Sequence, residues 1–182
     1  MTKLPKIAQS KIVAKSRLFT VEELAMEFSN GEKRIYERLK AGSNSAVLII
    51  PILDDEHFLL IREYAAGVES YELAFPKGLV EKNEVIIDAA NRELQEEVGY
   101  AAKRLTQLKK ISLAPGYLSH TMYLVLAEDL FASSLEGDEP EPIEVIKWKF
   151  KDIDQLIERD DFTEARSIAA LYLMQQYLGI NN

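Results

Sequence analysis

Residues 78–100 of this chain read Gly78-Leu79-Val80-Glu81-Lys82-Asn83-Glu84-Val85-Ile86-Ile87-Asp88-Ala89-Ala90-Asn91-Arg92-Glu93-Leu94-Gln95-Glu96-Glu97-Val98-Gly99-Tyr100. We expect Asn83 to cap the start of a helix, because its side chain can accept hydrogen bonds from the first free amides. Gly99 is expected just beyond the end of that helix, where glycine adopts a left-handed backbone at little cost. Good helix formers lie between them, without proline. The stretch therefore predicts a loop followed by a helix of about four turns.

Two glutamates continue the apolar stripe of this predicted helix. Positions spaced i, i+4, i+7 and i+11 share one line, and they hold Ile86, Ala90, Glu93 and Glu97. Carboxylates crowded on a partly buried edge repel one another and lose hydration unless something offsets this. A hard divalent cation such as Mg²⁺ would do so, since it prefers oxygen ligands. Glu93 and Glu97 are therefore our first metal ligands, and the neighbouring Glu96 is the next.

The alternative is a solvated acidic helix face, which is the commoner outcome for a helix with three glutamates. The rest of the stretch weighs against it, because its residues fill every place of a known motif: Gly78, Glu84, Arg92, Glu93, Glu96, Glu97 and Gly99, with Leu94 and Tyr100 at the bulky apolar positions. Seven fixed identities arise by chance on the order of once in 10⁸ windows. The chain thus resembles the Nudix hydrolase superfamily, which carries this motif as the Nudix box.

The resemblance implies an α/β fold, an α/β/α sandwich with a mixed sheet. It also implies Mg²⁺-dependent cleavage of a nucleoside diphosphate linked to a second group, with Mn²⁺ as a substitute. By the same resemblance, the backbone carbonyl of Lys77, just before the box glycine, binds metal. Arg92 is kept among the catalytic residues of the motif, but the resemblance implies a more structural role, in which it pairs with the box glutamate, here Glu84, and orients the loop. The box glycines serve backbone geometry.

Features outside the box resemble the ADP-ribose pyrophosphatase branch of this superfamily. Pro115 lies sixteen positions beyond Gly99, as in that branch. The segments around Arg62 and Glu72 resemble those that line the nucleotide sugar there, so both residues are candidate substrate contacts. The resemblance implies a pyrophosphatase of ADP-linked compounds.

The acidic loop Gly137-Asp138-Glu139-Pro140-Glu141-Pro142 matches the loop that carries a catalytic glutamate in that branch. Water that attacks a phosphate needs a proton acceptor, and the prolines limit the conformations of the loop. The resemblance favours Glu139 as the base, with Glu141 second. The alternative is a merely solvated loop, which would leave the role to Glu96, Glu93 or a metal-bound hydroxide.

The wider match covers nearly the whole chain and resembles bacterial hydrolases of ADP compounds. It rests on Ser16-Arg17-Leu18-Phe19-Thr20, Phe28-Ser29-Asn30-Gly31, Ile61-Arg62-Glu63-Tyr64, Ala90-Asn91-Arg92-Glu93-Leu94 and Leu135–Pro142. It implies ADP-ribose, diadenosine polyphosphates and NADH as substrates, with AMP as a product. It further implies a homodimer whose N-terminal strands complete the partner's nucleotide site. Phe28 would then stack on adenine, and Arg34 or Arg38 would meet phosphate or base, unless these arginines are only solvated.

We expect two parts in the chain. Residues 1–45 are predicted to form an N-terminal β-hairpin extension for dimerisation and substrate binding, and residues 46–182 the Nudix domain. Val21–Phe28 and Lys33–Leu39 predict two strands joined by a two-residue loop at Asn30-Gly31. A hairpin with little core needs a partner surface, whether on another subunit or on its own domain. Residues 41–45 are expected to be a linker.

Within the second part, the continuous apolar run Ala46–Leu53 predicts a central strand. Further strands are expected at residues 57–62, 71–75, 105–113, 121–127 and 145–150, with a loop over 62–70 and helices at 152–158 and 163–178.

Composition narrows the function. A net charge of −8 argues against a general binder of nucleic acid or membrane surfaces. An acidic protein with a phosphate substrate therefore needs local cations. The absence of cysteine excludes disulfides and thiolate metal sites and fits a reducing cytoplasm. The polar, lysine-bearing N-terminus does not predict a signal peptide.

Four other functions share parts of this pattern. A nucleoside triphosphatase of the MutT type would carry the box without the branch features. Another Nudix hydrolase could prefer a different sugar nucleotide, such as GDP-mannose. A non-catalytic Nudix-fold sensor would usually lack box carboxylates, and none is lost here. The absence of cysteine disfavours the zinc-ribbon type of NADH pyrophosphatase.

Overall fold

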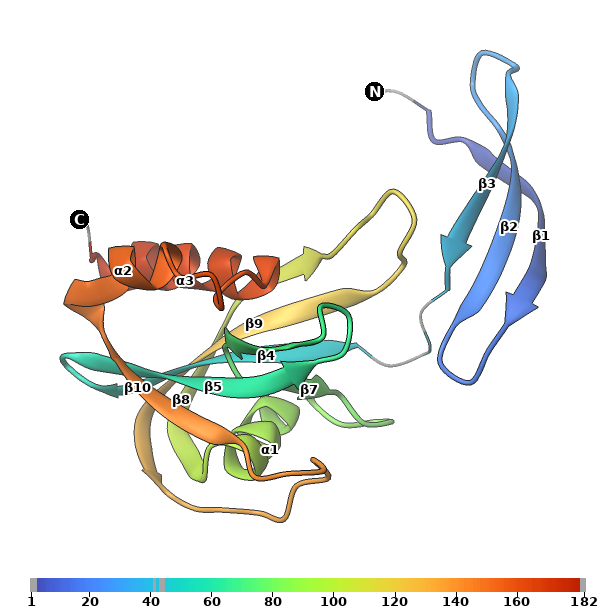
Figure 1. Cartoon of the computed structure of the whole chain (residues 1–182). Coiled ribbons are helices and arrows are strands. Elements are labelled where there is room, and N and C mark those ends of the chain that lie inside the picture. The colour runs from blue at the N-terminus through green and yellow to red at the C-terminus, as the bar shows by residue number, and fades with distance from the viewer. Residues whose placement is uncertain (1–2, 41, 43–44, 181–182) are drawn as a thin grey trace. The chain divides into compact units, whose positions relative to one another are not determined.

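The computed structural model describes residues 3–40, 42 and 45–180. It divides into two compact units, one of residues 1–44 with 112–121 and the other of residues 45–111 with 122–182 (Figure 1). Most of the predicted linker, residues 41, 43 and 44, lies outside the described residues. The smaller unit takes in residues 112–121, which we had placed in the Nudix domain. The domain boundary after residue 45 stays a prediction.

The larger unit is built on a seven-stranded mixed sheet. Its strands are β4 (Ala46–Asp54), β5 (His57–Ala65), β6 (Ser70–Ala74), β7 (Lys77–Leu79), β8 (Tyr100–Ser112), β9 (Thr121–Ala132) and β10 (Glu144–Lys149). Their order is β10-β5-β4-β9-β8, with β6 beside β5 and β7 beside β4. Strand β4 pairs with β9 in parallel and with β5 and β7 in antiparallel fashion. The predicted central position of this apolar strand is confirmed.

Helices cover both faces of this sheet (Figure 1). Helix α1 (Ile86–Glu97) lies on one face, and α2 (Ile153–Ile157) and α3 (Ala165–Leu178) lie on the other, after the short 3-10 helix η1 (Phe150–Asp152). Val47 and Ile49 of β4 join the core under α1. Because a strand alternates its side chains, the equally buried Leu48 and Ile50 face the opposite layer. The α/β/α sandwich is confirmed. No helix among the described residues is long and apolar enough to cross a membrane.

The ends of α1 agree only in part with expectation. Gly99 follows the C-cap Val98 with φ of +76°, as predicted. The N-cap is Val85 rather than Asn83, so that prediction is wrong. Asn83 instead takes φ of +68° in the preceding turn, a left-handed conformation that asparagine tolerates better than most residues.

The smaller unit contains a three-stranded antiparallel sheet of β1 (Lys6–Lys15), β2 (Thr20–Glu27) and β3 (Lys33–Leu39). The β2–β3 hairpin is confirmed, but its loop spans residues 28–32 rather than the two residues expected. Phe28 N–H donates to the Glu32 carbonyl at 2.9 Å, and Gly31 takes φ of +85° inside this longer turn. Strand β1 was not predicted, because its lysines and polar residues break the alternation that marks a strand.

The predicted loop 62–70 is largely strand. Strand β5 continues to Ala65 because β6 pairs with it from Ile61↔Ala74 to Ala65↔Ser70. The turn is therefore confined to residues 66–69. Strand β7 was also missed, since three residues are too few to show a period.

Candidate active site

Gly78 brings the loop backbone against the helix. A Cβ at this position would lie 1.9 Å from the carboxyl carbon of Glu93, so only glycine lets this carboxylate reach the loop. Strand β7 holds the loop in place through the pair Leu48↔Lys77. The box glycine therefore serves a close approach between the loop and the first predicted metal ligand.

Glu93 and Glu97 are both buried on the inner edge of α1, with 8% and 7% of their surface exposed. Burial raises the pKa of Glu97 to about 8, even though the backbone N–H of Lys77 donates to its Oε2 at 2.8 Å. Burial also raises the pKa of Glu93, and the charges of Glu96 and Glu139 act in the same direction. For both carboxylates, the loss of hydration on burial outweighs the contacts that favour the charged form.

Arg92 joins the loop to the helix. Its Nε donates to Glu84 Oε1 at 2.9 Å, which is the predicted pair, and its Nη2 donates to the Leu79 carbonyl at 2.9 Å. Its Nη1 also donates to Glu93 at 2.8 Å and to Glu96 at 2.9 Å, contacts that we did not foresee. The hydrogen bond with Glu84 raises the pKa of Arg92 further above its usual range.

The carboxylate oxygens of α1 fit a hard divalent cation. Among the described residues, no three acidic or histidine side chains are grouped closely enough to hold a metal ion. Arg92 lies against Glu93 and Glu96, and the Lys77 backbone N–H donates to Glu97. The buried carboxylates nevertheless keep raised pKa values, and oxygen ligands are those that Mg²⁺ prefers. The arrangement can accept a cation that would offset this charge.

Glu63 is a further neighbour that our sequence reasoning missed. Its Oε2 lies 2.6 Å from Lys77 Nζ, and its charge contributes to the raised pKa of Glu97. The segment around Arg62 had been singled out, but only the register of β5 shows that Glu63 faces the box.

The acidic loop reaches the end of α1. Glu139 and Glu141 line a cavity of about 500 Å³ together with Glu96 and Glu97. Ser133 lies shortly before the acidic loop. Its N–H donates to the Gly99 carbonyl at 3.1 Å, and its Oγ donates to Gln95 Oε1 at 2.8 Å. The structure therefore brings the two candidate bases to the same cavity as two of the candidate metal ligands, Glu96 and Glu97.

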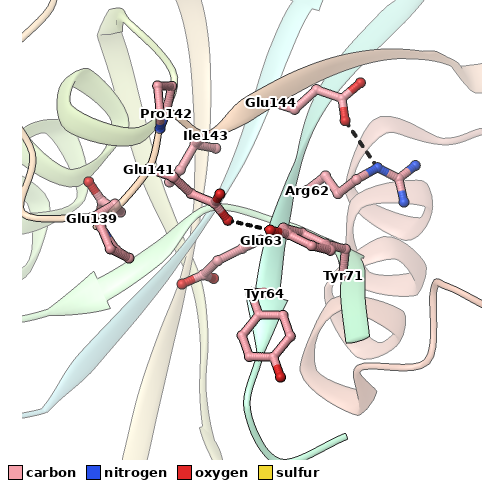
Figure 2. A pocket seen from close by; sticks show the side chains of 10 residues that line it. Arg62, Glu63, Tyr64, Tyr71, Glu139, Glu141, Pro142, Ile143 and Glu144 are labelled. Atoms are coloured by element: carbon pink, nitrogen blue, oxygen red, sulfur yellow. Dashed lines mark hydrogen bonds and ion pairs between the residues drawn. The ribbon is translucent and has the colours of Figure 1, made fainter. Parts of the chain in front are cut away.

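A second cavity, of about 370 Å³, opens on the other side of this loop (Figure 2). Its lining residues are Arg62, Glu63, Tyr64, Tyr71, Glu139, Pro140, Glu141, Pro142, Ile143 and Glu144. Arg62 pairs with Glu144 at 3.1 Å and with Asp161 at 2.7 Å.

Glu72, the other predicted substrate residue of this unit, forms hydrogen bonds with nearby hydroxyl groups. It accepts hydrogen bonds from Thr163 Oγ1 at 2.8 Å and from Ser70 Oγ at 3.1 Å, ahead of helix α3. Its predicted substrate contact stays a prediction.

The remaining predicted substrate residues belong to the smaller unit. Phe28, Arg38 and Pro115 line one cavity of about 360 Å³ there. Arg38 also pairs at 2.7 Å with Glu22, a carboxylate that is only 3% exposed. Arg34 is not part of this group, since it lies at another cavity of the same unit and pairs with Glu32 at 2.6 Å.

Comparison with known proteins agrees with this architecture. Residues 5–38 match the model of the NudE-type Nudix hydrolase N-terminal domain, and residues 42–171 match that of the NUDIX domain. The ADP compounds hydrolase NudE of Escherichia coli (strain K12) is 53% identical over 96% of this chain and 93% of its own. The ADP-ribose pyrophosphatase of Bacillus subtilis (strain 168) is 28% identical over 93% of this chain and 95% of its own.

Solved structures extend the comparison to three dimensions. A crystal structure of an ADP compounds hydrolase matches with a TM-score of 0.92 at 51% identity, covering 98% of this chain and 96% of that one.

Proposed function

Since this chain belongs to the Nudix hydrolases of the NudE type, we propose that it hydrolyses the pyrophosphate bond of ADP compounds with Mg²⁺ and releases AMP. ADP-ribose, diadenosine polyphosphates and NADH are the candidate substrates. The observation that carries the proposal is the pair of buried carboxylates, Glu93 and Glu97, held against the loop at Gly78 and Lys77.

Glu93, Glu97 and Glu96, with the backbone carbonyl of Lys77, would hold the metal. A divalent cation held there would supply the positive charge that offsets the pyrophosphate oxygens and would help to activate water. Mn²⁺ offers the same preference for oxygen and could replace Mg²⁺. Arg92 acts as a clamp between loop and helix, since its guanidinium contacts Glu84, Glu93 and the Leu79 carbonyl at once.

Glu139 is our general base for the attacking water, with Glu141 as the second candidate. It lines the same cavity as Glu96 and Glu97, and its charge raises the pKa of Glu93. A base within hydrogen-bond reach of the water can take its proton as the bond to phosphorus forms. The helix carboxylates would be occupied by metal and poorly suited to that role.

Substrate binding is assigned to both units. Arg62, in the cavity beside the loop, is suited to an anionic group. Phe28, Arg38 and Pro115 offer an aromatic ring and a cation around one cavity, which suits a nucleotide, with Arg34 and Glu72 as further candidates. We place the enzyme in the cytoplasm, in keeping with a chain that contains no cysteine. We also propose a homodimer, because the small N-terminal sheet needs a partner surface.

A product assay tests this function. Purified protein with Mg²⁺ is supplied with ADP-ribose, NADH, diadenosine triphosphate, GDP-mannose and dGTP, and nucleotide products are separated by chromatography. We expect AMP from the three ADP compounds, slower turnover of the other two, and no products in the presence of EDTA. Preference for dGTP would indicate a triphosphatase instead, and binding of ADP-ribose without any product would indicate a sensor.

A further inference from the structure

One hydrogen bond ties the acidic loop to the sheet. Tyr71 Oη donates to Glu141 Oε1 at 2.6 Å, between residues seventy positions apart (Figure 2). We propose that Tyr71 is a positioning residue that latches the acidic loop through Glu141, so that Glu139 is the loop carboxylate presented to the glutamates of α1. The proposal rests on the proposed function and chooses between the two candidate bases.

Tyr71 is a rigid anchor for such a latch. It lies in β6 directly opposite Tyr64 of β5, and the two rings contact edge to face with centroids 5.5 Å apart. The strand pairing therefore fixes the face of the sheet on which Tyr71 stands, and the contact with Tyr64 supports its ring there. A hydrogen bond to a carboxylate is stronger than one between neutral groups. The bond with Glu141 also raises the pKa of Tyr71, so the hydroxyl remains a donor well into the alkaline range.

Glu141 can transmit this constraint to its neighbours. It lies between Pro140 and Pro142, whose rings fix φ and leave few backbone conformations on either side. Holding the Glu141 carboxylate therefore restricts the path of the chain back to Glu139. Beyond it, Glu144 pairs with Arg62 at 3.1 Å and ties the same end of the loop to β5.

The opposite end of the loop is tied as well. Ser133 contacts Gln95 and Gly99 at the end of α1, and Leu135 N–H donates to the Gln95 carbonyl at 3.3 Å. The segment that carries Glu139 thus spans two anchored ends. Figure 2 shows Glu141 reaching toward Tyr71, whereas Glu139 lies apart from that pair. The two loop glutamates therefore have different tasks.

Tyr71→Phe tests the latch, because it removes the hydroxyl and keeps the ring. Tyr172→Phe is the matched control, since Tyr172 is similarly exposed but lies on α3. We expect Tyr71→Phe to lower kcat for ADP-ribose about tenfold, the effect of losing one hydrogen bond to a charged group, with KM nearly unchanged. The backbone amides of residues 134–143, apart from Pro140 and Pro142, which have none, should exchange hydrogen faster than in the wild type, while the control changes neither measurement.

A double-mutant cycle separates a latch from a direct substrate contact. If Tyr71 acts through Glu141, then Tyr71→Phe, Glu141→Ala and the double variant should lose similar kcat, without adding. Glu141→Gln should retain more activity than Glu141→Ala, because its amide oxygen can still accept from the phenol.

Additive losses, or unchanged exchange of the loop in Tyr71→Phe, would overturn the latch. The exchange measurement needs no turnover. If the wild-type protein hydrolysed none of the ADP compounds, the proposed function would fail while faster loop exchange in Tyr71→Phe would still support the loop contact.

Discussion

Gly78 shows how much of the site depends on one residue. The box motif predicts a glycine at this position but does not say why it is needed. The structure gives the reason, since a Cβ there would lie only 1.9 Å from the carboxyl carbon of Glu93. Arg92 is similar, since its pairing with Glu84 was expected, whereas its contacts with Glu93 and Glu96 depend on rotamers that a motif does not specify.

Gly78→Ala should therefore displace the Glu93 carboxylate. We expect kcat to fall roughly 100-fold, because a shift of about 1 Å in a catalytic group can cost that much, while the protein stays folded by circular dichroism. Gly67→Ala is the matched control, since a Cβ there meets no atom within 4 Å. Native turnover of Gly78→Ala would show that the close approach is not needed.

At the scale of elements, prediction succeeded where a pattern was long and local. The apolar run of β4 and the box helix were both foreseen, and the prolines marked the acidic loop. The bond between Tyr71 and Glu141 was not foreseen, because it joins strand β6 to a loop seventy residues further along the chain, and only the folded structure brings the two together. Strand β1 was missed because every one of its residues is exposed, which leaves no buried face for a pattern to reveal.

The acidic loop gives the prediction at this scale. Glu139→Gln should lower kcat strongly, since an amide cannot take the proton of the attacking water. The Kd for substrate and the affinity of the free protein for Mg²⁺ should change little. Glu141→Gln should have a smaller effect. If both variants kept wild-type turnover by initial rates, the loop would be only solvated charge and the base would have to be sought on α1 or at the metal.

At the scale of the whole molecule, the three-stranded sheet and the turn between β1 and β2 leave apolar side chains uncovered. They are Ile7, Ile12, Val13, Leu18, Phe19, Ile35 and Tyr36, each at least 41% exposed. A small sheet is marginally stable without a partner for such a surface. The sequence of one chain does not show which surface covers these side chains, so the homodimer remains a prediction.

We expect a homodimer. Sedimentation equilibrium at micromolar concentration should give twice the chain mass of 20.7 kDa. Ile35→Glu places a charge on the exposed sheet and should shift the equilibrium toward monomer. A monomeric wild-type protein with full activity would contradict this assembly.

The central claim is that the buried carboxylates of α1 hold the metal at which the ADP compound is hydrolysed. Its most direct test combines calorimetric titration of Mg²⁺ with rates of AMP release from ADP-ribose for the wild type, Glu97→Gln and the exposed-site control Glu158→Gln. Loss of a metal ligand is worth several kcal/mol of transition-state stabilisation. We therefore predict that Glu97→Gln stays folded, binds Mg²⁺ more weakly and turns over at least about 100-fold more slowly, while Glu158→Gln matches the wild type. Near-native metal affinity and kcat in a folded Glu97→Gln variant would contradict the account.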